Sequence, residues 1–259
     1  MKPVHFYETG TGYPLVFLHG FCESGSLWKE LSEVLSDEFR IICPDLPGFG
    51  QSPLPDKEFS LTDIANQLAT WLKNLGIEKC IVIGHSLGGY VSLEMLRHHG
   101  ELVKGIGLFN SSAYDDPADK KENRNKLIAF IGENGVAPFL KTFVPSLFYH
   151  ERAYEHRATI ENIRKEGLSI KPESVMSYAA AMRDRVSSID LLESNPDLIL
   201  LISGEEDQNV PIDISRQMGK LLNNENVHFM PESAHMSVFE HRDLSYDAIR
   251  SFARKFSSI

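Results

Sequence analysis

A serine flanked by glycines is the first group in this sequence that is suited to chemistry. Gly84, Ser86 and Gly88 form a G-x-S-x-G pattern that follows the β-branched apolar run 81–83 and precedes a helix-forming stretch. A serine hydroxyl is a weak nucleophile unless the backbone holds it where a base can reach it. A sharp strand-to-helix turn does this, and it needs small neighbours because the two backbones approach closely. We therefore predict that Ser86 is a nucleophile; an ordinary structural turn is the alternative.

A serine nucleophile requires a base, and the base requires an acid that orients it. Asp207 lies shortly after an apolar run, and His235 lies in the loop after the last predicted strand. Parallel strands deliver their carboxyl ends to one edge of a sheet, so both side chains are expected beside Ser86. Glu205 and Glu206 are alternatives for the acid.

Acyl transfer also requires hydrogen-bond donors for the developing oxyanion. The turn in "FLHGFCES" offers the backbone N–H of Phe21, and the helix that follows the nucleophile begins with the N–H of Leu87. We predict that these two groups form the oxyanion hole. Three other polar residues near strand ends, His19, Asp45 and His85, are interpreted as structural.

The elements that position these residues alternate along the chain. Apolar runs predict about seven strands, in the ranges 2–14, 14–20, 39–45, 79–85, 103–110, 197–204 and 226–232. Helical spacing of apolar residues appears in 26–36, 60–76 and 91–100. This alternation is typical of an α/β fold with a mostly parallel sheet flanked by helices. We expect the first strand to be an antiparallel neighbour of the second.

One interval interrupts the alternation. About 85 residues separate the fifth strand from the sixth, and nearly all of them have helical patterns, whereas an ordinary connection is far shorter. We therefore predict a core made of residues 1–111 and 187–259, with an inserted helical cap at 112–186. Such an insertion is expected to act as a lid over the carboxyl ends of the strands, where ligands bind.

Composition restricts the class of protein. The 259-residue chain has a formal net charge of -10 and no cluster of Lys and Arg, which argues against nucleic-acid binding. No apolar run is long enough for a membrane span or resembles a signal peptide, so a cytoplasmic protein is expected. Cys22, Cys43 and Cys80 are predicted to be free thiols, and the histidine spacing supports no metal site.

The predicted cap contains an apolar stretch, "VAPFLKTFVPSLFY". We expect Phe139, Phe143, Leu147 and Phe148 to line a substrate pocket above Ser86. The alternative is that the whole apolar stretch packs against the core. Arg183 and Arg185, in "AMRDR", are in principle able to bind a substrate carboxylate. With Asp184 and Asp190 close in sequence, a solvated surface pair is the preferred interpretation.

The chain resembles the α/β-hydrolase superfamily, of the single-cap type that includes small carboxylesterases and meta-cleavage-product hydrolases. The matching motifs are "HGF" at 19–21, "DLPGFGQS" at 45–52, "GHSLGG" at 84–89, "GEEDQNVP" at 204–211 and "SAHMSVFE" at 233–240. The resemblance implies Ser86 as nucleophile, Asp207 as acid, His235 as base, and the Phe21 and Leu87 amides as oxyanion hole. A serine rather than an aspartate nucleophile is unlike haloalkane dehalogenases and epoxide hydrolases. Members commonly begin with two antiparallel strands, so the first edge strand is expected to be missing here.

These observations lead to a carboxylesterase that acts on small or medium uncharged esters, without a cofactor and without a nucleic-acid or membrane partner. Two alternatives use the same residues to cleave a carbon-carbon bond or a thioester. A third alternative, of another class, is a ligand receptor built on a hydrolase fold.

Overall fold

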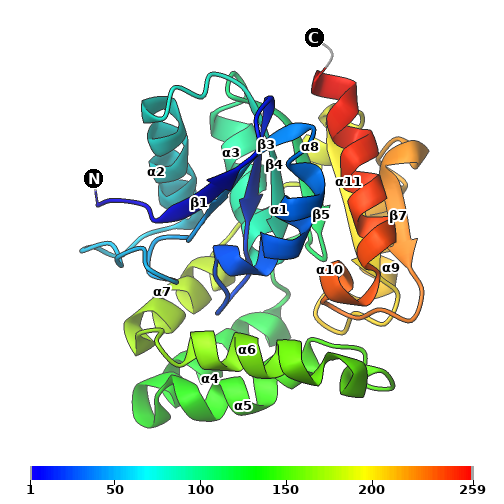
Figure 1. The fold of residues 1–259 in the computed structure, drawn as a ribbon. Coiled ribbons are helices and arrows are strands. Elements are labelled where there is room, and N and C mark those ends of the chain that lie inside the picture. Colours follow the sequence, from blue (N-terminus) through cyan, green and yellow to red (C-terminus); the bar gives the residue numbers. More distant parts are fainter. Residues whose placement is uncertain (1, 258–259) are drawn as a thin grey trace.

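A computed structural model describes residues 2–257, and within that range a seven-stranded sheet forms the centre of the molecule (Figure 1). Its strand order is β1-β3-β2-β4-β5-β6-β7, and all neighbouring pairs except β1 and β3 are parallel. The strands are β1 (Phe6–Thr9), β2 (Tyr13–Leu18), β3 (Phe39–Pro44), β4 (Cys80–His85), β5 (Val103–Phe109), β6 (Ile199–Gly204) and β7 (Val227–Met230). The predicted fold class is confirmed.

The pairing of the first strand was predicted wrongly. β1 lies antiparallel to β3, not to β2, with Phe6 opposite Pro44. Gly10 and Gly12 both have a positive φ, and a Cβ at Gly10 would lie 2.2 Å from the carbonyl oxygen of Phe39. This turn therefore carries the chain closely across the start of β3, so that β2 pairs on its other side.

Helices cover both faces of the sheet (Figure 1). Alternate side chains of β2 point to opposite faces: Val16 belongs to the apolar cluster under α2 and α3, and Phe17 to the cluster under α1 and α11. Ser60 and Asp63 form a capping box that begins α2. The flanking helices are α1 (Lys29–Leu35), α2 (Leu61–Asn74), α3 (Leu87–His98), α8 (Ile189–Ser194), α9 (Ile212–Gly219), α10 (Ser237–Glu240) and α11 (Arg242–Ser257).

Four longer helices lie between β5 and β6, inside the range 112–186 that the sequence assigns to a cap. They are α4 (Ala118–Asn134), α5 (Val136–Ser146), α6 (Arg157–Gly167) and α7 (Pro172–Arg183). Figure 1 shows them together beyond one end of the sheet, in green and yellow-green. We call this group of four helices the helical insertion. Since β5 leads directly toward α4, the insertion lies at the carboxyl ends of the strands.

The three cysteines are buried free thiols, as predicted. Burial raises the pKa of the Cys43 and Cys80 thiols to about 12, so both are protonated at neutral pH. No helix in residues 2–257 is both long enough and apolar enough to cross a membrane.

Candidate active site

Ser86 lies on a tight turn between β4 and α3. Its φ of 49° and ψ of -112° are a strained backbone conformation for a residue with a side chain. A Cβ at Gly84 would lie 2.2 Å from the backbone of Gly88, and one at Gly88 would lie 2.4 Å from the carbonyl oxygen of Leu18. The two glycines of the G-x-S-x-G pattern are therefore required by close backbone contacts.

The hydroxyl of Ser86 is not used to cap the helix that it precedes. A serine at this position normally accepts a hydrogen bond from the first turn, but in α3 the Ser86 side chain makes no capping bond. The backbone of Ser86 is fixed instead, because its N–H donates to the Phe109 carbonyl at 2.9 Å and its carbonyl accepts from the Ser111 hydroxyl at 2.7 Å. This leaves a rigidly held serine with its hydroxyl free for chemistry.

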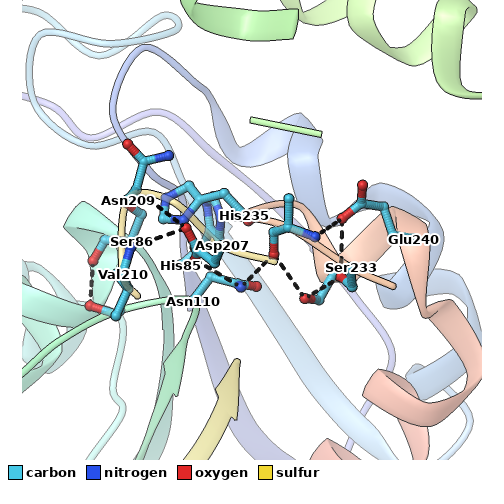
Figure 2. A network of polar contacts seen from close by, with 12 residues as sticks. His85, Ser86, Asn110, Asp207, Asn209, Val210, Ser233, His235 and Glu240 are labelled. Carbon is cyan, nitrogen blue, oxygen red and sulfur yellow. Dashed lines mark hydrogen bonds and ion pairs between the residues drawn. The ribbon is translucent and has the colours of Figure 1, made fainter. Parts of the chain in front are cut away.

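Asp207 and His235 meet at the same edge of the sheet (Figure 2). The Nδ1 atom of His235 lies 2.7 Å from Oδ2 of Asp207, and both side chains are buried. The other carboxylate oxygen accepts hydrogen bonds from the N–H groups of Asn209 and Val210. Burial disfavours the ionised carboxyl, but His235 and these N–H groups outweigh burial and lower the pKa of Asp207.

An ionised Asp207 requires a proton on Nδ1 of His235, because a carboxylate can only accept. In the neutral imidazole, Nε2 is then the nitrogen that is able to take a proton. The loop of His235 lies against the turn of the serine, since the His235 carbonyl is 2.8 Å from Nε2 of His85, the residue before Ser86. The structure thus brings the three predicted residues to one place (Figure 2).

The two alternative acids lie elsewhere. Glu205 forms an ion pair with Arg216 at 3.4 Å, and Glu206 is exposed. Among the residues that are described, Asp207 is the carboxylate that bonds His235.

Two residues that support this pair were missed in the sequence. The Asn110 amide donates to Oδ2 of Asp207 at 3.2 Å and to the Ala234 carbonyl at 2.9 Å. Glu240 accepts from the Ala234 N–H at 2.8 Å and from the N–H of Tyr149, which lies in the loop between α5 and α6. Asn110 had a usable signal, because it is a polar residue directly after a buried strand.

The predicted oxyanion donors belong to the segments that follow β2 and β4, two strands that pair side by side. Phe21 follows β2, and Leu87 is the first residue of α3, whose N–H groups in the first turn have no carbonyl partner within the helix. The neighbouring Cys22 has a φ of 63°, which marks a sharp turn at Phe21. Both donors therefore belong to backbone segments with fixed, unusual geometry.

A cavity of about 690 Å³ reaches Phe21, whereas Ser86, Leu87 and His235 are not among the residues that line it. Its lining includes Phe21 and also Asn209 and Val210, whose N–H groups bind Asp207. Phe139 and Phe143 stack on one another at 4.6 Å between ring centroids, and each meets the ring of Phe21 in a T-shaped contact, at 6.2 and 6.0 Å. Charged residues of both signs form another part of the lining: Asp115, Asp116, Asp119, Lys120, Arg124 and Arg185.

Two of the four predicted pocket residues do not line this cavity. Leu147 and Phe148 are 2% and 3% exposed and belong to the core beside α10. Phe148 packs on the rings of His156 and Phe239, and the Leu147 carbonyl accepts the backbone N–H of His235 at 2.9 Å. The prediction is wrong for both because α5 ends at Ser146, so these two residues lie in the turn after the helix, which packs into the core.

The surface interpretation of the two arginines is right for one and wrong for the other. Arg183 is partly exposed and bonds Asp184. The Arg185 side chain is only 7% exposed; it pairs with the buried Asp116 at 2.8 Å and lies 4.0 Å over the ring of Tyr90. This partner, 69 positions earlier in the chain, was not visible in the local pattern.

Comparison with known proteins places the chain in a family. A family model described as alpha/beta hydrolase fold matches residues 13–242. The chain belongs to the α/β-hydrolase family. Its resemblance to this superfamily, noted from the motifs, is confirmed, and relatives of similar length include esterases and a hydrolase.

Three similar proteins illustrate the range of relatives. A thermophilic esterase from Thermogutta terrifontis, solved with malate bound, has a TM-score of 0.90 and 31% identity, with 98% of this chain and 94% of that chain covered. A pimeloyl-[acyl-carrier protein] methyl ester esterase of Vibrio atlanticus is 25% identical over 97% of this chain and 98% of its own. A 2-hydroxy-6-oxo-6-(2'-aminophenyl)hexa-2,4-dienoic acid hydrolase of Metapseudomonas resinovorans is 23% identical over 98% of this chain and 88% of its own.

Proposed function

We propose that this α/β hydrolase is a carboxylesterase that works through an acyl-enzyme on Ser86. The observation that carries the proposal is the 2.7 Å contact between His235 and Asp207 beside a serine held on a strained turn. This geometry leaves one imidazole nitrogen free to accept a proton. The similarity to the Thermogutta esterase and the Vibrio methyl ester esterase favours esters over other acyl compounds.

In the proposed reaction, the Ser86 hydroxyl attacks the acyl carbon while Nε2 of His235 takes its proton. The N–H groups of Phe21 and Leu87 bind the oxyanion of the tetrahedral intermediate. The imidazolium of His235, held by Asp207, then protonates the leaving alcohol. Water repeats the sequence on the acyl-enzyme and releases the acid, so the reaction needs no cofactor.

We further propose that the helical insertion is the lid of this site and that the preferred substrates are small or medium uncharged esters. The aromatic wall of Phe21, Phe139 and Phe143 supplies an apolar surface next to the oxyanion hole. The lining cations are balanced by carboxylates, and Arg185 is already paired with Asp116. A substrate carboxylate would therefore compete with an existing ion pair.

A series of p-nitrophenyl esters of increasing acyl length, compared with a dicarboxylic half-ester of matched length, tests this proposal. Each added methylene that contacts the pocket is expected to raise kcat/KM by at most a few-fold until the pocket is full. Ser86→Ala is expected to remove turnover of all of them. Faster turnover of the half-ester, lost in Arg185→Ala, would contradict the preference for uncharged esters.

The relative from Metapseudomonas supports a second candidate, hydrolysis of a carbon-carbon bond with the same residues. A thioester is a third substrate type for the same chemistry. Both belong in the same screen. Carbon-carbon cleavage faster than ester cleavage, and abolished by Ser86→Ala, would replace the esterase proposal while keeping Ser86 as a functional residue.

A further inference from the structure

Glu23 and His85 form a buried pair that the proposed reaction does not use. Nδ1 of His85 lies 2.9 Å from Oε2 of Glu23, and their side chains are 1% and 3% exposed. Removing two ionisable groups from water is costly, and an apolar pair of similar volume is often at least as stable. Stability alone is therefore a weak reason to bury such a pair. The pair lies beside the proposed active site.

The hydrogen bonds of the pair end on three separate segments of that site. Oε2 of Glu23 also accepts the Gly20 N–H at 2.6 Å, directly before the oxyanion residue Phe21. His85 is the residue before Ser86, and its Nε2 bonds the backbone carbonyl of His235 at 2.8 Å. One buried pair thus connects the oxyanion turn, the nucleophile turn and the loop of the base.

The donors and acceptors define the charge state of the pair. A backbone carbonyl and a carboxylate both accept, so both nitrogens of His85 carry hydrogens and the ring is a cation. Burial alone would lower the pKa of His85 and raise that of Glu23, but their mutual attraction outweighs burial and shifts both pKa values the other way. The pair is ionised but carries no net charge. Its histidine lies close to the proposed base, with 5.0 Å between the ring centroids of His85 and His235.

The oxyanion turn closes directly onto the pair. A Cβ at Gly20 would lie 2.7 Å from Oε2 of Glu23 and 2.7 Å from Nδ1 of His85. The Trp28 ring lies edge-on to the His85 ring, with 6.5 Å between centroids. The pair therefore sits in a tightly filled space, in direct contact with the backbone of the oxyanion turn.

We propose that Glu23 and His85 are positioning residues for acyl transfer. They hold the Phe21 N–H, the Ser86 turn and the His235 loop at the relative positions that the reaction requires. The inference rests on the proposed function of Ser86. A displacement of about 1 Å at reacting groups costs about 10²-fold in rate. A shift of these segments relative to one another is therefore expected to lower kcat rather than weaken substrate binding.

Two amide substitutions of His85 separate its two hydrogen bonds. The amide nitrogen of asparagine falls near the position of Nδ1 and keeps the contact with Glu23, whereas that of glutamine reaches the position of Nε2 and keeps the bond to the His235 carbonyl. We expect His85→Asn to lower kcat by about 10- to 100-fold, with KM changed by less than about threefold. His85→Gln should recover at least about fivefold of that loss, because the base loop is held again.

The control is a destabilising substitution far from the site. Ile77 is 2% exposed and precedes β4 at its amino end, which is the sheet edge opposite Ser86. Ile77→Ala should lower the thermal midpoint and leave kcat nearly unchanged. Glu23→Leu provides a further variant of similar volume; it removes the oxygen that accepts the Gly20 N–H and binds Nδ1 of His85, so it should lower kcat without a matching change in KM.

The measurements are kcat and KM on a p-nitrophenyl ester, with thermal midpoints, for wild type and all variants. If the His85 and Glu23 variants lose no more kcat than Ile77→Ala at an equal loss of thermal midpoint, the pair is only structural and the inference is wrong. If wild-type turnover persists in Ser86→Ala, the proposed function itself fails and the inference fails with it.

Discussion

Replacing Asp207 with asparagine should disable the base without changing the shape of the site. Oδ1 of Asp207 receives two backbone N–H groups, from Asn209 and Val210. The oxygen of the new amide must occupy this position, because its NH₂ group cannot accept these bonds. The NH₂ group then faces Nδ1 of His235 at the place where Oδ2 now lies, 2.7 Å away.

That NH₂ group forces Nδ1 of His235 to accept a hydrogen bond, so the proton moves to Nε2. A protonated Nε2 cannot take the proton of Ser86. A wrong tautomer in a Ser-His-Asp triad costs up to about 10⁴-fold in kcat. We therefore expect Asp207→Asn to lower kcat by about 10³- to 10⁴-fold, which corresponds to roughly 4 to 6 kcal/mol of transition-state stabilisation.

The assay is steady-state hydrolysis of a p-nitrophenyl ester, with a thermal midpoint recorded for each variant to verify folding. Glu205→Gln and Glu206→Gln are the matched controls, and both should keep kcat within a few-fold of wild type because neither side chain bonds His235. A crippled Glu206→Gln beside an Asp207→Asn variant of nearly normal kcat would refute the assignment of the acid.

Two further predictions concern the pocket and the buried pair. Phe143→Ala should lower kcat/KM for a butyrate ester by about tenfold with little loss of stability, since Phe143 lines the cavity. Leu147→Ala should instead lower the free energy of unfolding by about 2 to 5 kcal/mol, because Leu147 is buried. The reverse pattern would exclude Phe143 from the pocket. Because the pKa of His85 is raised and that of Glu23 lowered by folding, the pair stabilises the fold fully between about pH 4.3 and about pH 6.5, the pKa values of the unfolded groups. The difference in thermal midpoint between wild type and His85→Asn should therefore be largest in that window and shrink as the pH rises through the raised pKa of His85; a difference that grows above it would contradict an ionised pair.

The parts of this structure that follow from local patterns were predictable from the sequence. The turn at Ser86 is one, because a buried β-branched run, two glycines at fixed spacing and a helical stretch together allow few other conformations. The positions of Asp207 and His235 follow from the rule that parallel strands end at one edge.

The parts that depend on distant partners were not predictable in this way. The pairing of β1 with β3 depends on how closely Gly10 approaches Phe39, and a pattern of apolar residues does not encode that contact. Arg185 looked like a surface residue because its partner Asp116 lies on the far side of the helical insertion in sequence.

Assignment of the pocket residues failed for a related reason. Phe143 and Leu147 are close in sequence and equally apolar, yet only Phe143 lines the cavity. The deciding contact is the bond from the His235 N–H to the Leu147 carbonyl, which no spacing rule contains. Glu23 carried no signal of its own, since a single acidic residue in a loop is usually solvated.

The most direct measurement of the central claim is the site at which a fluorophosphonate labels the folded protein. Such a probe reacts readily only with an activated serine. Ser111 and Ser112 are the nearest competitors, but the first donates to the Ser86 carbonyl and the second accepts the Tyr114 N–H. We predict that peptide mapping finds the label on Ser86 alone and that Ser86→Ala removes it while Ser111→Ala does not. A label that persists in Ser86→Ala, or that maps to Ser111 or Ser112, would contradict the account.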